Sequence, residues 1–132
     1  MKRIVNAIAA CLMGLSCQGQ QKEFRSVSVE EFAQAMADTT VVLLDVRTAE
    51  EHAAGYIEGT MLQIDVKKPD FDSLAVAHIK KASTVALYCR SGNRSKRAAS
   101  TLAAKGYQVI ELATGYNGWV QAGKPVVVPE EE

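Results

Sequence analysis

Apolar positions along the chain form short continuous runs that alternate with segments of helical spacing. Four runs are typical of strands buried on both faces, and they cover residues 40–46, 61–66, 84–88 and 107–112. Residues 126–128 form either a further short strand or a tail. Helical spacing or helix-start signals mark residues 29–37, 48–55, 70–81, 95–105 and 115–122. This alternation predicts an α/β fold, with a central parallel sheet of about five strands and helices on both faces.

Two of the predicted helices begin with a capping box, a hydroxyl residue followed three positions later by a glutamate. The pairs are Ser28 with Glu31 and Thr48 with Glu51. Gly106 follows the helix predicted over residues 95–105, where a left-handed backbone favours glycine.

The N-terminal segment differs from the rest of the chain. Lys2 and Arg3 precede an almost entirely apolar run over residues 4–15, and the sequence turns polar from Gln18 onward. This is the arrangement of a bacterial export signal. The alternative, an amphipathic first helix, is disfavoured because the apolar run has no polar face.

Two cysteines lie in or after this apolar run, and each could be the site of lipoprotein processing. The sequence before Cys11 fits the lipoprotein box better, but processing there would leave a very short apolar core. We therefore expect lipidation at Cys17, with simple cleavage as the alternative. Residues 1–20 would be an export signal and short polar tether, and residues 21–132 one domain of a periplasmic or membrane-anchored protein.

Composition narrows the class of protein further. With 132 residues there is room for one hydrophobic core, and 48% hydrophobic residues exclude a disordered chain. The formal net charge is zero, which gives no indication of a nucleic-acid partner. Of the three cysteines, only Cys89 would remain as a free thiol after processing. One cysteine makes neither an intramolecular disulfide nor a cysteine-based metal site, so we expect no metal and no cofactor.

The most informative segment is the loop that Cys89 opens, between the strand over residues 84–88 and the helix from Ser95. Its other residues are Arg90, Ser91, Gly92, Asn93 and Arg94. Open α/β sheets bind ligands at this position, because the helix N-terminus presents free N–H donors. Cations flank the thiol, which favours the thiolate. We interpret the loop as a nucleophilic thiol in an anion-binding cradle, rather than as a buried structural cysteine before a basic helix.

Three separated motifs resemble those of the rhodanese family of sulfurtransferases. They are Leu44-Asp45-Val46-Arg47 with Glu51 and the run from Gly55 to Thr60, then Cys89 to Arg94, and finally the run from Gly115 to Trp119. Together the motifs span most of the chain from Val27 to Lys124, which makes the resemblance specific.

The resemblance implies a mechanism. The Cys89 thiolate would attack the outer sulfur of a donor such as thiosulfate, expel sulfite and become a persulfide. Cyanide or a thiol would then accept the sulfur; in the cell we expect a small thiol or a thioredoxin-like protein. Arg90 and Arg94 would hold the donor's oxygens, and the backbone N–H groups from Arg90 to Ser95 would stabilise the sulfur anion.

Other charged and aromatic residues receive supporting or structural interpretations. Asp45, Arg47 and Glu51 could orient the loop arginines, or could form an ion-pair network that holds the first strand–helix turn. The remaining candidates are expected to be packing or surface residues: His52, His78, Lys96, Arg97 and Trp119.

Two rival functions are the alternatives to sulfur transfer, which the spacing of the loop favours. A cysteine phosphatase or arsenate reductase would also use a thiolate loop, but phosphatase signatures place five residues between cysteine and arginine. Here four residues separate Cys89 from Arg94, and no aspartate general acid is evident. A non-catalytic rhodanese module that binds a partner or senses oxidation is the second rival.

Overall fold

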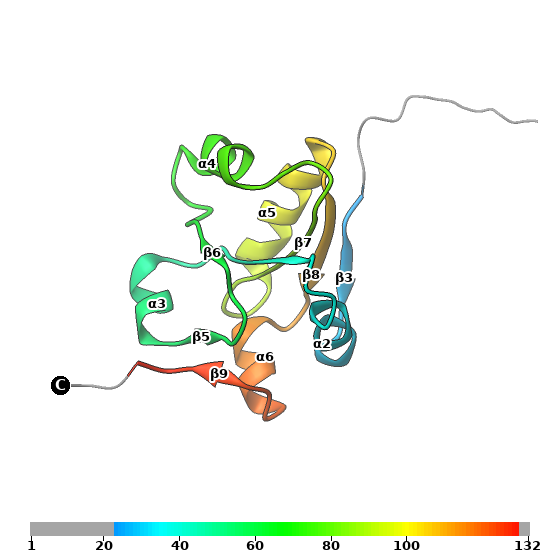
Figure 1. Cartoon of the computed structure of the whole chain (residues 1–132). Helices are drawn as coiled ribbons and strands as arrows, with labels where there is room; N and C mark the ends of the chain where they lie inside the picture. The colour runs from blue at the N-terminus through cyan, green and yellow to red at the C-terminus, as the bar shows by residue number, and fades with distance from the viewer. Residues whose placement is uncertain (1–22, 130–132) are drawn as a thin grey trace, which may run out of the picture.

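A five-stranded parallel sheet lies at the centre of the computed structural model, which describes residues 23–129 (Figure 1). In spatial order its strands are β3 (Arg25–Val27), β8 (Gln108–Leu112), β7 (Thr84–Tyr88), β4 (Val42–Asp45) and β6 (Leu62–Gln63). All four neighbouring pairs are parallel. The carboxyl ends of the strands therefore meet at one edge of the sheet, where α/β folds place their sites.

Helices cover both faces of this sheet, and with the parallel strands they confirm the predicted fold class. The helices are α2 (Val29–Met36), α3 (Ala49–Ala54), α4 (Phe71–His78), α5 (Asn93–Ala104) and α6 (Gly115–Gln121). Buried residues of α4 and α5 join one hydrophobic cluster, while those of α2 and α6 join the other. Helix α3 follows the carboxyl end of β4 directly and contributes no fully buried residue.

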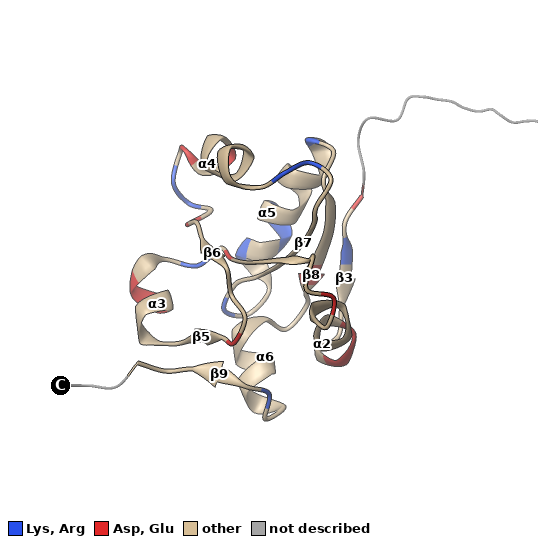
Figure 2. Cartoon of the chain, in the orientation of Figure 1, with Lys and Arg blue, Asp and Glu red and all other residues tan. Residues whose placement is uncertain are grey.

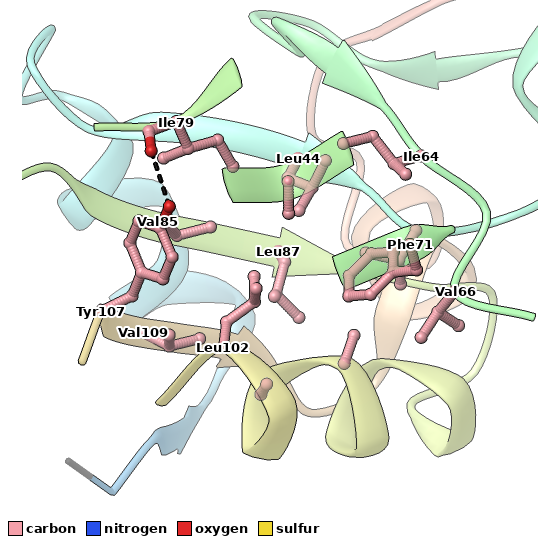
Figure 3. Packing of buried hydrophobic residues seen from close by; sticks show 14 of the residues in the cluster. Leu44, Ile64, Val66, Phe71, Ile79, Val85, Leu87, Leu102, Tyr107 and Val109 are labelled. Carbon is pink, nitrogen blue, oxygen red and sulfur yellow. Dashed lines mark hydrogen bonds between the residues drawn. The ribbon is translucent and has the colours of Figure 1, made fainter. Parts of the chain in front are cut away.

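The central strand β7 shows how the sequence pattern builds two cores. Val85 and Leu87 point into the α4–α5 cluster, whereas Ala86 and Tyr88 point into the α2–α6 cluster. Successive side chains of a strand alternate between faces, so an unbroken apolar run is needed where both faces are covered. Figure 3 shows Leu87 and Leu102 packed between the sheet and α5, with Tyr107 donating to the Ile79 carbonyl at 2.6 Å.

The fifth strand of the sheet is β3, not the segment over residues 126–128. Residues Val126–Val127 form β9, which pairs antiparallel with β5 (Tyr56–Ile57) outside the main sheet. Two-residue strands and an exposed three-residue edge strand carry too little apolar pattern to be predicted from sequence.

Several elements are shorter than, or shifted from, their predicted ranges. The strand predicted over residues 61–66 is reduced to Leu62–Gln63. The helix predicted over residues 70–81 ends at His78, because buried Ile79 turns to an extended conformation. Helix α5 begins two residues earlier than predicted, at Asn93.

The predicted export signal, with Cys11 and Cys17, lies outside the described residues. Among residues 23–129, every helix is too short or too polar to cross a membrane.

Candidate active site

Cys89 lies directly after β7, at the carboxyl edge of the sheet, and is buried beneath its own loop. Gly92 closes this loop with a left-handed backbone (φ 107°), and a Cβ atom there would collide with the Ala113 carbonyl. A side chain at this position is therefore excluded by both backbone angle and space.

The start of α6 supports the loop from behind. The backbone N–H of Tyr116 donates to the Cys89 carbonyl at 2.8 Å, and that of Asn117 donates to the Arg90 carbonyl at 3.0 Å. Gly115 (φ 67°) permits this approach, because a Cβ atom there would lie 2.5 Å from the Arg90 carbonyl oxygen. The glycine-containing motif near the C-terminus thus acts on the thiol loop through backbone contacts.

Several donors converge on the Cys89 sulfur. The backbone N–H of Gly92 donates to Sγ at 3.1 Å, and the Ser95 hydroxyl lies 3.3 Å from it. Burial raises the pKa of the Cys89 thiol, but the hydrogen bond shared with the Ser95 hydroxyl and those from the N–H groups of Ser95, Gly92 and Ser91 outweigh burial and lower this pKa. The loop therefore favours a sulfur anion without any nearby histidine.

Arg94 is held by Glu51 in a two-bond ion pair. Its two terminal nitrogens donate to the carboxylate at 2.7 and 2.9 Å, and both side chains are about three-quarters covered. This contact with Arg94, together with the capping hydrogen bonds to Thr48, lowers the pKa of Glu51 to about 2. Figure 2 shows acidic residues on α3 and basic residues on α5, the two helices that supply this pair. Of the two roles considered for Glu51, the structure favours orientation of a loop arginine.

Asp45 and Arg47 form a second pair, which is almost fully buried. The Arg47 guanidinium donates to Asp45 at 2.8 Å and to the Gly55 carbonyl at 2.6 Å, and it lies 4.4 Å from the centre of the Tyr116 ring. For Asp45 and Arg47 the structure favours the ion-pair network that holds the first strand–helix turn. His52 joins this network, with Nδ1 2.9 Å from the Asp45 carboxylate.

Arg90 is the loop cation that is exposed to solvent. Among residues 23–129 its side chain makes no hydrogen bond or ion pair, in contrast to Arg94. A cavity of about 210 Å³ opens beside it, lined also by Arg47, Glu51, Tyr116 and Asn117. Ser91 and Asn93 are exposed on the same loop, and Asn93 begins α5. This arrangement can receive a small anion beside Arg90 of the thiol loop.

Sequence analysis missed one buried charge at the site. Glu111 in β8 is fully buried and accepts hydrogen bonds from Ser95 (2.5 Å), Ser26 (2.6 Å) and Lys96 (3.3 Å). The available signal was a single glutamate inside an apolar strand, since such a charge needs partners. Lys96 also donates to the Gly92 carbonyl at 2.9 Å, so this half-exposed side chain contacts the thiol loop as well as Glu111.

The other residues given structural interpretations lie away from the sulfur. Trp119 is buried in the α2–α6 cluster and donates to the Pro125 carbonyl, which confirms its core assignment. His78 is exposed, and His52 stacks on Tyr56. Arg97 donates to the Val66 carbonyl at 3.1 Å. Among residues 23–129, no three acidic, histidine or cysteine side chains are grouped as metal ligands would be.

The fold and the thiol loop define a rhodanese-type domain, and comparison with known proteins agrees. Residues 28–122 match the family of rhodanese-like domains, so the chain belongs to this family.

Individual relatives extend the match beyond the family model. A protein named sulfurtransferase from Allochromatium vinosum is 37% identical, over 79% of this chain and 95% of its own. Thiosulfate sulfurtransferase 18 of Arabidopsis thaliana is 29% identical over 89% and 94%. The crystal structure of a rhodanese-related protein from Thermoplasma volcanium superposes with a TM-score of 0.67 at 24% identity, over 80% of this chain and 99% of that one.

Proposed function

We propose that this protein is a sulfurtransferase that carries a sulfane sulfur as a persulfide on Cys89. The observation that carries the proposal is the Cys89 sulfur itself, buried at the carboxyl end of β7 with the Gly92 N–H 3.1 Å away and further donors beside it. The names of the relatives, one sulfurtransferase and one thiosulfate sulfurtransferase, support the same reaction and a thiosulfate-like donor.

In the first step the Cys89 thiolate attacks the outer sulfur of thiosulfate. A new sulfur–sulfur bond forms to Cys89, the bond within thiosulfate breaks, and sulfite leaves with the electron pair. The negative charge then lies on the outer persulfide sulfur. The inward-pointing N–H groups of the loop are suited to hold it, since oriented backbone donors favour anions.

In the second step an acceptor thiolate attacks that outer sulfur and Cys89 leaves as a thiolate. Both steps move sulfur between nucleophiles, so the cycle returns the starting thiolate without a general acid. We propose a small thiol or a thioredoxin-like protein as acceptor, because Cys89 is the one cysteine of the predicted mature chain.

The two loop arginines have different parts in this proposal. Arg90 is exposed beside the 210 Å³ cavity and binds the donor's oxygens. Arg94 is bound to Glu51, so it contributes a fixed positive charge near the sulfur rather than a guanidinium group that is free to bind the donor.

The reaction is tested by intact-mass analysis of the full chain after incubation with thiosulfate. One sulfur atom should be added, and cyanide or a thiol should remove it. Cys89→Ser is the control, because it leaves Cys11 and Cys17 in place. An adduct of equal yield in Cys89→Ser would contradict the assignment.

We further propose that the chain is exported and anchored through Cys17. The basic start, the apolar run over residues 4–15 and the following cysteine support this proposal. Labelling of cells with a palmitate analogue should mark the protein and should fail for Cys17→Ala. A cytoplasmic product that retains Met1 would contradict both export and the anchor.

A further inference from the structure

A buried carboxylate, that of Glu111, is linked to the Cys89 sulfur through two successive hydrogen bonds. The Ser95 hydroxyl stands between them, 3.3 Å from Sγ and 2.5 Å from the Glu111 carboxylate. Glu111 is fully buried in β8, in register with Leu87 of β7, whose apolar side chain offers no counter-charge. A charge in such a place needs a reason, because burial without partners is costly.

The Ser95 hydroxyl has one proton, and both neighbours compete for it. With that proton on the short bond to Glu111, Ser95 presents an oxygen lone pair to the sulfur. A lone pair accepts from a thiol S–H, but it repels a thiolate. Ser95 stabilises the thiolate only when its proton turns toward Sγ, and Glu111 must then rely on its remaining donors.

Those remaining donors come from two other elements. Ser26 of β3 donates to Glu111 at 2.6 Å, and Lys96 of α5 approaches it at 3.3 Å while also binding the Gly92 carbonyl. The Lys96 side chain is half exposed, so solvent partly screens its charge. Lys96 is the one cation among the described residues that contacts both the carboxylate and the thiol loop.

We propose that Glu111 is a positioning residue that sets, through Ser95, whether Cys89 stands as a thiol or as a thiolate, with Lys96 as its counter-charge. Glu111 draws the Ser95 proton away from the sulfur and restrains thiolate formation; Lys96 weakens that pull. This role of Glu111 matters for sulfur transfer only if the proposed function holds, and in that respect the inference rests on the proposed function.

Other charged groups also face the thiol loop and must be held constant. Arg94 of α5 lies near the sulfur with its charge paired to Glu51 of α3, and Asp65 also acts on Arg94. Arg90 is exposed on the loop itself. Helix α6 contributes no charged residue, and at the end of β4 Asp45 and Arg47 pair with each other, with His52 beside Asp45.

The test is the pH dependence of alkylation of Cys89 by iodoacetamide, which reports the thiolate fraction without any sulfur donor. Glu111→Gln keeps the side-chain volume, removes the negative charge and offers Ser95 an amide donor. It should lower the apparent pKa of Cys89 by about one unit. At pH values below that pKa, alkylation should therefore be about tenfold faster. Lys96→Met should shift the same pKa upward by about half a unit.

Opposite shifts are what separates this role from a structural one, because loosened packing would move both variants in one direction. Lys105→Met is the matched control: it lies just beyond α5 and pairs with Asp72, and it should shift nothing. If Glu111→Gln does not fold, the pKa shift of Lys96→Met still tests the proposal, because the Lys96 side chain is half exposed and its replacement should leave the fold intact. A folded Glu111→Gln with an unchanged or raised pKa, or shifts of equal sign, would overturn the proposal.

The part played by Ser95 has its own test. In a Ser95→Ala background the shift caused by Glu111→Gln should shrink, because the shared proton is gone; an undiminished shift would remove Ser95 from the proposal. The titration needs no sulfur transfer. Opposite pKa shifts in a chain that forms no persulfide would therefore overturn the proposed function and leave this inference in place.

Discussion

Two arginine–carboxylate pairs lie beside the thiol loop, and they differ in burial and in what they hold. Asp45 and Arg47 are almost fully buried and bind the turn after β4 through the Gly55 carbonyl. Glu51 and Arg94 are about one-quarter exposed and connect α3 to the first turn of α5. The Asp45–Arg47 pair stabilises the scaffold, while the Glu51–Arg94 pair fixes one charge of the loop. Two arginine–carboxylate pairs at neighbouring positions can therefore serve the stability of the fold in one case and the active site in the other.

The largest effect should come from breaking the buried pair. Asp45→Ala leaves the Arg47 guanidinium buried with only a carbonyl partner, and it should reduce the free energy of unfolding by about 3–5 kcal/mol. Urea unfolding measures this loss. Asp72→Ala, which breaks the exposed pair with Lys105, is the control and should cost less than about 1 kcal/mol. Equal losses in the two variants would contradict the role given to Asp45.

Removing the exposed loop cation should affect donor binding without affecting stability. Arg90→Ala should raise the thiosulfate KM by the equivalent of about 1.5–3 kcal/mol, because a charge-assisted hydrogen bond is lost. Its urea unfolding should match the parent, since the exposed Arg90 side chain makes no hydrogen bond or ion pair among residues 23–129. Arg90→Lys should recover only part of the binding. An unchanged KM in Arg90→Ala would place donor binding elsewhere.

Of the three changes, loss of the Glu51–Arg94 pair should have the smallest effect, and this effect should depend on pH. Glu51→Gln should reduce the free energy of unfolding by about 1–2 kcal/mol near neutral pH, after allowance for exposure. The pKa of Glu51 is lowered from 4.5 to about 2, so its stabilisation is fully present above pH 4.5 and is lost as pH falls through about 2. Urea unfolding of parent and variant at several pH values should show two curves that converge toward pH 2. Curves that stay parallel would show that the ionised Glu51 carboxylate is not the source of this stabilisation.

Much of the fold could be predicted from the sequence because the sheet is buried on both faces. Residues 84–88 were predicted with their observed bounds, since this short apolar run is rich in strand-forming residues and ends where the polar thiol loop begins. The strand β3 was missed because only Val27 of its three residues is buried. Its place in the sheet comes from pairing with β8, more than 80 residues away in the chain.

The candidate site was predictable where its residues are close in sequence. The thiol and the loop that holds it follow from one segment of seven residues, 89–95. The pairing of Glu51 with Arg94 and of Ser95 with Glu111 does not, because these contacts join different elements across 43 and 16 residues. Which of several nearby charges meet is decided by strand register and helix placement, which a local pattern does not contain.

The most direct test of sulfur transfer is the mass of the intact protein after thiosulfate treatment, compared between the parent and Cys89→Ser. The parent should gain one sulfur atom, lose it on addition of a thiol, and release one equivalent of sulfite. Cys89→Ser should gain none. A parent that binds no sulfur, or a Cys89→Ser protein that gains as much, would contradict a persulfide carried on Cys89.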